Sequence, residues 1–228
     1  MIGHDAPLME DFATVQNWVF DLDNTLYPSS SDLFPQIRHK MTHYVASLLN
    51  ISQEEAIGLR HKYYKDYGTT LAGLMHHHHV EPDDFLHYVH DIDYSIIEEN
   101  INLRHVLMAL EGKKYIFTNG SKQHAQTTLQ SLGIADLFEV IFDIKMGDYI
   151  PKPERSIYEK FLQHTGIKAE NTAMFEDMPQ NLRIPHKFGF KTILVADKGV
   201  VHPELKLHMG DHIHYQIINL TAFLNDLL

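Results

Sequence analysis

Residues 17–28 read NWVFDLDNTLYP, and this stretch decides how the rest of the chain is interpreted. Its first part, NWVFDL, is short and apolar and runs into polar, turn-forming residues, so we predict a buried β-strand ending near Leu22. Residues two apart on an extended segment project to the same side, so Asp21 and Asp23 can face one site. One carboxylate could then act as a nucleophile while the other moves a proton. The alternative is a plain strand end followed by a turn.

The second half of the chain alternates short apolar runs with helix-like patterns. Strands are predicted at Lys114–Thr118, Val140–Ile144, Thr172–Phe175 and Thr192–Ala196. Helices are predicted at Ser121–Leu132, which Gly133 closes, and at Pro179–Phe188. Such alternation is typical of a mostly parallel sheet with helices on both faces. We therefore predict an α/β fold with a doubly wound, Rossmann-like parallel sheet.

The residues between the first strand and the second have a mainly helical pattern. The sequence SQEE at Ser52–Glu55 fits a capping box that opens a helix, and Gly68 is placed to end that helix. Shorter helices are predicted at Leu71–His78 and Pro82–His90. A helical insertion directly after the first strand indicates a cap domain. The predicted domains are a core of residues 1–27 and 101–228 and a helical cap of residues 28–100.

The composition restricts the class of protein. Of the 228 residues, 19 are Lys or Arg and 30 are Asp or Glu, which gives a formal net charge of −11. This balance argues against binding to nucleic acid polymers, which requires a cationic surface. A small anionic substrate can still bind where a cation reverses the local field. The absence of cysteine excludes thiolate nucleophiles, disulfides and Cys-ligated zinc.

No secretion signal and no membrane span is expected. The N-terminal sequence MIGHDAPLMEDFATVQ carries acidic residues where a signal peptide would be basic and then apolar. No run of about 18 apolar residues occurs, so we predict no membrane-spanning segment. The expected location is the cytoplasm.

A second group of candidate residues lies where the strand predicted at Lys114–Thr118 passes into a helix. A small hydroxyl and free backbone N–H groups at such a junction can bind a phosphate. Thr118, Asn119 and Gly120 would form this cradle. The alternative is an ordinary helix N-cap, for which Ser121 is well suited.

A third candidate is Lys152, which stands between two prolines in the sequence PKP. The prolines restrict the backbone and limit the directions in which the lysine can project. Its ammonium group could neutralise a phosphoryl oxygen and hold a nucleophilic carboxylate. The alternative is a solvated surface lysine.

The fourth group is the acidic pair Glu176-Asp177, directly after the apolar strand predicted at Thr172–Phe175. Adjacent acids with no basic neighbours repel one another unless a cation lies between them. Magnesium prefers oxygen ligands and keeps several waters, so two or three carboxylates suffice to hold it. The alternative is a solvated acidic turn that opens the next helix.

These four groups, in this order, resemble the motifs of the haloacid dehalogenase-like hydrolase superfamily, from DxDxT to a final acidic pair. The resemblance extends over nearly the whole chain. It implies that Asp21 is the nucleophile and Asp23 the general acid and base, and that Thr118 and Lys152 stabilise the phosphate. Dehalogenases of the superfamily are expected to lack the second acid, so Asp23 favours phosphate over halide chemistry.

The same resemblance implies a magnesium site. Its ligands would be Asp21, the backbone carbonyl of Asp23 and Asp177, with Glu176 supporting the metal's waters. Some members have two aspartates at the last position. Glu176 is therefore a departure, which should alter the surroundings of the metal more than the reaction.

A narrower resemblance, to the pyrimidine 5′-nucleotidase-like branch, comes from the text around the motifs. It rests on FDLDNTLYP, YYKDYGTTLAGL, VHDIDY and IFTNGSKQHAQTTLQSLGIADLF. That branch implies a nucleoside monophosphate substrate that the cap helices recognise. Rings that stack on a base and hydroxyls for its edge would come from Tyr63, Tyr64, Tyr67, Thr69 and Thr70. The alternative is that the tyrosines pack in the core or rim of the cap.

Taken together, the expected activity is magnesium-dependent hydrolysis of a small phosphomonoester through an aspartyl-phosphate, with a nucleoside monophosphate as substrate. A second possibility is a phosphatase for a sugar phosphate or another small metabolite, with the same core and a different cap. A third, of another class, is a non-catalytic regulator that binds a nucleotide or a partner. The intact acids and lysine speak against the regulator.

The run His76–His79 invites comparison with a metal site. Consecutive residues on a helix point in different directions, so the four side chains cannot all face one metal. We interpret the run as a solvated helix end, with weak adventitious binding of nickel or zinc as the alternative.

Overall fold

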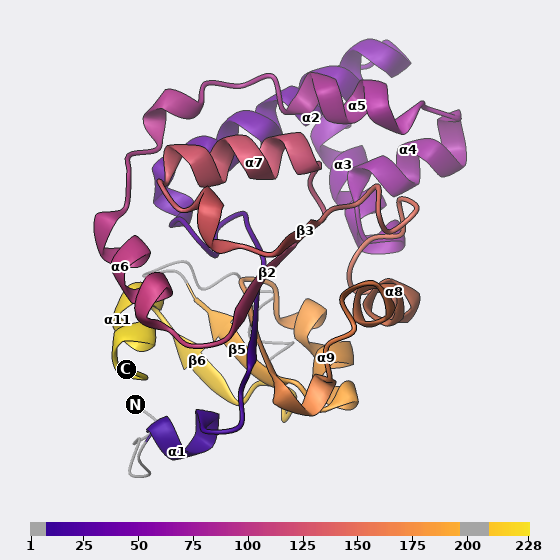
Figure 1. The fold of residues 1–228 in the computed structure, drawn as a ribbon. Helices are drawn as coiled ribbons and strands as arrows, with labels where there is room; N and C mark the ends of the chain where they lie inside the picture. Colours follow the sequence, from indigo (N-terminus) through magenta and orange to yellow (C-terminus); the bar gives the residue numbers. More distant parts are fainter. Residues whose placement is uncertain (1–7, 197–209) are drawn as a thin grey trace.

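The computed structural model describes residues 8–196 and 210–228, which form a six-stranded sheet flanked by helices (Figure 1). The strand order is β3-β2-β1-β4-β5-β6, and every neighbouring pair is parallel. The strands are β1 (Asn17–Phe20), β2 (Lys113–Phe117), β3 (Val140–Phe142), β4 (Thr172–Glu176), β5 (Lys191–Val195) and β6 (Tyr215–Ile217). The order reverses direction at β1, which is the switch point where open α/β sheets bind ligands.

Apolar side chains on both sides of β1 explain why helices cover both faces of the sheet. Phe20 packs in a buried cluster with residues of α6, α7 and α11, whereas Val19 packs on the opposite face with residues of α8 and α9. These helices are α6 (Ile101–Ala109), α7 (Lys122–Ser131), α8 (Arg155–Thr165), α9 (Arg183–Phe188) and α11 (Leu220–Asn225). The predicted doubly wound α/β fold is confirmed.

The strand register brings the candidate residues to one edge of the sheet. Phe20 of β1 pairs with Ile116 of β2 on one side and with Phe175 of β4 on the other. Asp21 directly follows Phe20, Glu176 directly follows Phe175, and Thr118 lies two residues beyond Ile116. These residues therefore emerge close together at the carboxyl end of the sheet.

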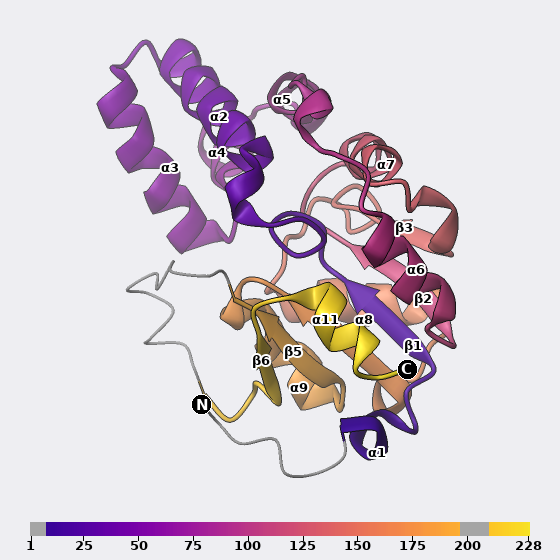
Figure 2. The ribbon, with the colours of Figure 1, turned by 90° about the vertical axis from the view of Figure 1, so that its left-hand side faces the viewer.

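Helices α2 to α5 lie between β1 and β2 in the chain and gather at one end of the sheet (Figures 1 and 2). They are α2 (Leu33–Leu49), α3 (Gln53–Tyr67), α4 (Thr70–His78) and α5 (Pro82–Val89). Their apolar faces pack into a separate cluster, which includes Val45, Ala56, Leu74 and Phe85 and which Ile144 of the core joins. We call these four helices the cap, and we keep residues 28–100 as the proposed extent of this domain.

Local signals in the cap sequence match the structure. The Ser52 side chain accepts from the Glu55 N–H while the Glu55 carboxylate accepts from the Ser52 N–H, which is the predicted capping box. Gly68 ends α3 with a φ of 82°, a left-handed conformation that suits glycine. His76–His79 lie at the end of α4, where the Tyr67 and Tyr63 hydroxyls hydrogen-bond to two of the rings.

Short elements and connections complete the chain. These are α1 (Leu8–Phe12) and the 3₁₀ turns η1 (Ser29–Ser31), η2 (Tyr94–Ile96), η3 (Ala135–Leu137), η4 (Ala169–Asn171) and η5 (Pro179–Leu182). The helix predicted at Pro179–Phe188 is therefore divided into η5 and α9. Across residues 8–196 and 210–228, no helix combines the length and the apolar character needed to cross a membrane.

Candidate active site

Asp21 is the first residue after β1 and is anchored between strands. Its backbone N–H donates to the carbonyl of Phe175 at 2.9 Å, so the pairing of β1 with β4 continues as far as Asp21. The residue is 7% exposed, and Oδ1 accepts from the Lys152 ammonium at 2.7 Å. Oδ2 accepts from the Thr25 hydroxyl at 3.3 Å. A buried carboxylate beside an ammonium and a hydroxyl is oriented for use as a nucleophile.

Lys152 is 1% exposed and makes three hydrogen bonds through its ammonium group. Its acceptors are Asp21 Oδ1 and Glu176 Oε2, both at 2.7 Å, and the Phe117 carbonyl at 2.8 Å. Burial disfavours the charged form, but the attraction of the two carboxylates outweighs burial and raises the pKa of Lys152 above its usual range. The predicted contact between Lys152 and the first carboxylate is thus present in the structure.

Asn119 holds the loop that carries Lys152. The Asn119 side-chain oxygen accepts from the Lys152 backbone N–H at 2.9 Å, and its amide donates to the Lys152 carbonyl at 3.3 Å. Asn119 therefore lies beside the site through backbone contacts to this loop, and its predicted contact with substrate stays a prediction.

The acidic pair after β4 joins Asp21. Ligand oxygens of Asp21, Glu176 and Asp177 lie within 4.8 Å of one another. Glu176 is 1% exposed, and its Oε1 also accepts from the backbone N–H groups of Asp177 and Met178 at 3.1 and 3.0 Å. Burial and then the negative charge of Glu176 raise the pKa of both aspartates, and that of Asp177 rises far above its usual range.

This cluster fits a divalent cation. When all three carboxylates are ionised, Lys152 balances one charge and leaves two negative charges that a buried site cannot hold cheaply. Asn24, whose amide donates to Asp177 at 3.4 Å, has a buried Oδ1 without a hydrogen-bond partner in the described chain. Hard oxygen donors of this kind are the ligands that magnesium prefers.

The junction between β2 and α7 forms a second wall of the site. Thr118 is 2% exposed, and its hydroxyl accepts from the Gly120 N–H at 2.9 Å. A Cβ on Gly120 would lie 3.2 Å from the His124 ring and 3.3 Å from the Thr118 hydroxyl, so a larger residue would crowd this loop. Ser121 caps α7 by accepting from the His124 N–H at 3.3 Å. The N-cap interpretation of Ser121 is therefore confirmed.

Asp23 lies against two aromatic side chains that the sequence did not single out. Its Oδ1 hydrogen-bonds to His124 Nε2 at 2.8 Å, and the Tyr27 hydroxyl donates to the same oxygen. Burial raises the pKa of Asp23, but the His124 and Tyr27 contacts outweigh burial and lower it below its usual value. Tyr27 belongs to the first motif, whereas a histidine three residues beyond Ser121 carries no recognisable signal.

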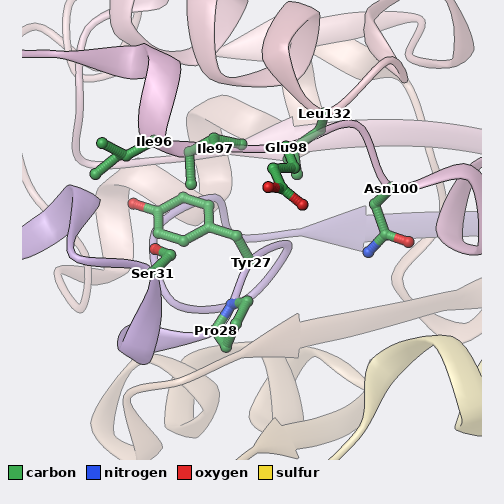
Figure 3. Close-up of a pocket in the computed structure, with 8 residues that line it drawn as sticks. All are labelled: Tyr27, Pro28, Ser31, Ile96, Ile97, Glu98, Asn100 and Leu132. Atoms are coloured by element: carbon green, nitrogen blue, oxygen red, sulfur yellow. The ribbon is translucent and has the colours of Figure 1, made fainter.

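A cavity of about 230 Å³ is lined in part by the Tyr27 side chain (Figure 3). Pro28, Ile97 and Leu132 contribute to its wall. Its lining includes none of Asp21, Asp23, Glu176 and Asp177, so we do not assign it to the substrate.

The candidate residues of the cap differ in their burial and in their contacts. Tyr63 is 4% exposed, packs on Gly73 and hydrogen-bonds to His78 at 2.7 Å, which puts it in the interior of the cap. Tyr67 and Thr69 are half-buried at the turn between α3 and α4.

Thr70 and Tyr64 flank that turn. Thr70 is buried at the start of α4, and Thr69 caps this helix by accepting from the Ala72 N–H at 3.1 Å. Tyr64 is exposed and accepts from the Gln180 amide at 2.7 Å, so it links the cap to the core. A Cβ on Gly68 would lie 3.1 Å from Pro151, which shows that this end of α3 rests on the loop carrying Lys152.

Comparisons with known proteins agree with this geometry. A family model described as haloacid dehalogenase-like hydrolase matches residues 17–188. The chain is 28% identical over 215 residues to "Phosphate metabolism protein 8" of Saccharomyces cerevisiae, covering 86% of this chain and 66% of that protein, just under two thirds of its length. It is 25% identical over 204 residues to "Glyceraldehyde 3-phosphate phosphatase" of Methanocaldococcus jannaschii, covering 79% and 85%.

Solved structures share the fold. A putative HAD-hydrolase, YfnB from Bacillus subtilis bound to magnesium, superposes with a TM-score of 0.61 at 15% identity, covering 93% of this chain and 98% of the other. The family model covers most of the chain, including β1, β2 and β4 and the residues Asp21, Thr118 and Glu176 at their carboxyl ends. This chain belongs to the haloacid dehalogenase-like hydrolase family.

Proposed function

We propose that this protein is a magnesium-dependent phosphatase that hydrolyses small phosphomonoesters through an aspartyl-phosphate. The observation that carries the proposal is the buried cluster in which Lys152 joins Asp21 to Glu176, with Asp177 beside them. Phosphoryl transfer depends mainly on positioning and charge neutralisation, and this cluster supplies both. A protein that only bound a nucleotide would have no need for a nucleophile, an acid and a buried lysine together.

In the first step, an oxygen of Asp21 forms a bond to phosphorus while the bond from phosphorus to the ester oxygen breaks. Asp23 transfers a proton to the departing oxygen, which leaves as an alcohol. The charge of a bound phosphate dianion raises the pKa of Asp23 and so favours the protonated form that this step requires. Lys152 holds Asp21 in place during the attack.

In the second step, Asp23 removes a proton from a water molecule that attacks the same phosphorus. The bond between phosphorus and Asp21 breaks, and inorganic phosphate leaves. The Thr118 hydroxyl and the loop N–H groups around Gly120 are proposed to hold the phosphoryl oxygens. Bound magnesium, held by Asp21, Asp177 and the Asp23 carbonyl, would neutralise charge on the phosphoryl group.

Removal of divalent cations is expected to abolish phosphate release. The carboxylates of Asp21 and Asp177 would repel each other and the incoming phosphate without a cation between them. Phosphate release from 4-nitrophenyl phosphate should be measured with excess chelator, and then after magnesium is added back. Full activity in the chelated protein would exclude the proposed metal dependence. Calcium is a suitable comparison ion, because it fits octahedral oxygen sites less well than magnesium.

For the leaving group we propose a pyrimidine nucleoside, so that UMP and CMP are the substrates. The core can contact only the phosphate, so the cap must recognise the rest. What supports a nucleoside is the α3–α4 turn, whose Gly68 rests on the loop of Lys152. Tyr67 directly precedes Gly68, and Thr69 and Thr70 directly follow it. An aromatic ring can stack on a base, and hydroxyls can bond to its edge.

The expected result is a higher kcat/KM for UMP and CMP than for glucose 6-phosphate or phosphoglycolate. Tyr67→Ala and Thr70→Val should lower kcat/KM for UMP more than for 4-nitrophenyl phosphate, because the core stays intact. Tyr88→Ala is a matched control, since Tyr88 is also half-buried in the cap and bonded to a histidine, His43 at 2.7 Å. Equal losses on both substrates would mean that Tyr67 and Thr70 only hold the cap together.

A second candidate substrate is a sugar phosphate or another small metabolite. It is favoured by the name of the relative from M. jannaschii, a glyceraldehyde 3-phosphate phosphatase. The same substrate panel, with glyceraldehyde 3-phosphate added, distinguishes the two. If each nucleotide is slower than a sugar phosphate, the nucleotidase proposal is wrong while the phosphatase proposal stands. If 4-nitrophenyl phosphate and the whole panel release no phosphate with magnesium, the phosphatase proposal fails and the non-catalytic regulator is favoured.

A further inference from the structure

We propose that His124 is a positioning residue for the general acid Asp23. It would hold one carboxylate oxygen of Asp23 so that the other faces the departing group. This inference rests on the proposed phosphatase function, and it adds a residue that lies outside the four motifs.

The two oxygens of Asp23 have different surroundings. Oδ1 hydrogen-bonds to His124 Nε2 at 2.8 Å and also accepts from the Tyr27 hydroxyl. Across residues 8–196 and 210–228, no side chain hydrogen-bonds to Oδ2, which points towards the phosphate-binding loop, 3.8 Å from where a Cβ on Gly120 would lie. The contacts thus separate a held oxygen from one that is available for proton transfer.

The His124 ring is itself fixed in one orientation. It has no solvent exposure, and its Nδ1 hydrogen-bonds to the Tyr94 hydroxyl at 2.9 Å. Its face stacks on the His90 ring with centroids 4.4 Å apart and planes inclined by 5°. His90 in turn bonds to the Ser121 hydroxyl at 3.0 Å. Both ring nitrogens of His124 therefore have partners and one face is covered, so the ring cannot turn without breaking buried hydrogen bonds.

The residues of this cluster come from both connections between core and cap. Tyr27 precedes α2, whereas His90 ends α5 and Tyr94 begins η2. His124 belongs to α7 of the core. The orientation of Asp23 therefore depends on the positions of both connections. A residue that only packs locally would not need contacts with both of them.

A positioning role predicts a dependence on the leaving group. Protonation matters for an alkoxide, which leaves poorly, and much less for 4-nitrophenolate, which is a stable anion. General acid–base contributions are on the order of 10²- to 10⁴-fold. In single-turnover experiments with enzyme in excess, only the first step limits release of the alcohol, so the two leaving groups can be compared directly.

The experiment compares wild type, His124→Ala and His124→Gln with magnesium. The substrates are 4-nitrophenyl phosphate and the fastest alkyl phosphate among UMP, CMP, glucose 6-phosphate and phosphoglycolate. For His124→Ala we expect alcohol release to fall on the order of 100-fold, with 4-nitrophenolate release reduced less than about tenfold and the half-saturating enzyme concentration unchanged. His124→Gln, which can still donate to Asp23, should recover at least about tenfold of the loss.

Thr128→Val is the matched control. Thr128 lies one turn further along α7, has no exposure, and its hydroxyl has no hydrogen-bond partner within the described residues. This change tests disturbance of the helix and should leave both rates unaltered. Should His124→Ala not fold, Tyr94→Phe takes its place, because it frees Nδ1 of His124 and should produce the same preference in a weaker form.

Equal losses on both leaving groups, with His124→Gln no better than His124→Ala, would overturn the positioning role and leave His124 as a packing residue. A wild-type protein that releases neither alcohol nor 4-nitrophenolate would instead overturn the phosphatase proposal. The two failures are therefore separate results.

Discussion

Asp21→Asn is expected to abolish turnover and phosphate labelling of the protein. The amide oxygen is a poor nucleophile, so no aspartyl-phosphate forms. The loss in kcat should be about 10⁴-fold or more, since removal of a nucleophile that acts with other groups as a unit has cost about 10⁶-fold in a well-studied hydrolase. The protein should remain folded, because the change removes a charge from a buried site with three carboxylates and one lysine.

The measurement is rapid quench into acid with a radiolabelled substrate, followed by location of the label. Wild type should carry acid-stable phosphate on Asp21 in the first turnover, and Asp21→Asn should carry none. Asp143→Asn is a suitable control, because Asp143 is also buried beyond the end of a strand and accepts from backbone N–H groups at 2.8 and 3.0 Å. It should still be labelled. Wild-type turnover by Asp21→Ala would remove Asp21 from the mechanism.

Lys152→Met should both destabilise the protein and inactivate it. The methionine side chain has a comparable length but no charge, so Asp21 and Glu176 would remain buried without their cation. Removing one partner of a buried ion pair typically costs about 3 to 5 kcal/mol. The free energy of unfolding should fall by that amount in urea titrations of the metal-free protein, and kcat should fall at least about 100-fold with magnesium present.

Lys114→Met provides the comparison for this prediction. Lys114 is also buried, at 8% exposure, but its ammonium donates to the carbonyls of Leu110 and Gly112 at 2.6 and 3.0 Å. It lies at the opposite end of β2 from the site. The change should therefore cost less stability and leave kcat unaltered. If Lys152→Met were as stable and active as Lys114→Met, the ion pairs of Lys152 would have no role in the site.

Much of the candidate site could be predicted from the sequence because most of its residues lie at the end of an apolar strand or just after it. Asp21 comes after β1, Thr118 after β2, and Glu176 ends β4. Parallel strands in register bring these positions to one edge, so a linear pattern becomes a spatial cluster. Lys152 is held there by a hydrogen bond from its backbone N–H to the Asn119 side chain. The two residues are far apart in the sequence, so their spacing does not reveal this contact.

The surroundings of Asp23 could not be predicted in this way. His124 is 101 positions from Asp23 in the chain, and the sequence contains 18 histidines with nothing to mark this one. The contact depends on how α7 packs against the first motif and on where the cap connections cross. Each of these is a property of tertiary packing rather than of local pattern.

In the cap, too, some features could be predicted from the sequence and others could not. The start of α3 at Ser52 and its end at Gly68 could be predicted, because capping depends on a few adjacent residues. Which tyrosine enters the interior of the cap was not predictable: Tyr63 packs on Gly73, whereas Tyr64 reaches Gln180 of the core. Neighbouring residues on a helix diverge in direction, and only the packing partner decides which of them is buried.

By itself, the sequence determined the α/β class, the order of the strand-end motifs and the residues of the carboxylate cluster. These depend on hydrophobic periodicity and on residues close together in the chain. The tertiary structure alone decided the strand order, including the short edge strand β6, and the His124 contact that orients Asp23. Those features join segments far apart in the chain, and their free energy comes from burial and hydrogen bonds that exist only after the segments have packed together.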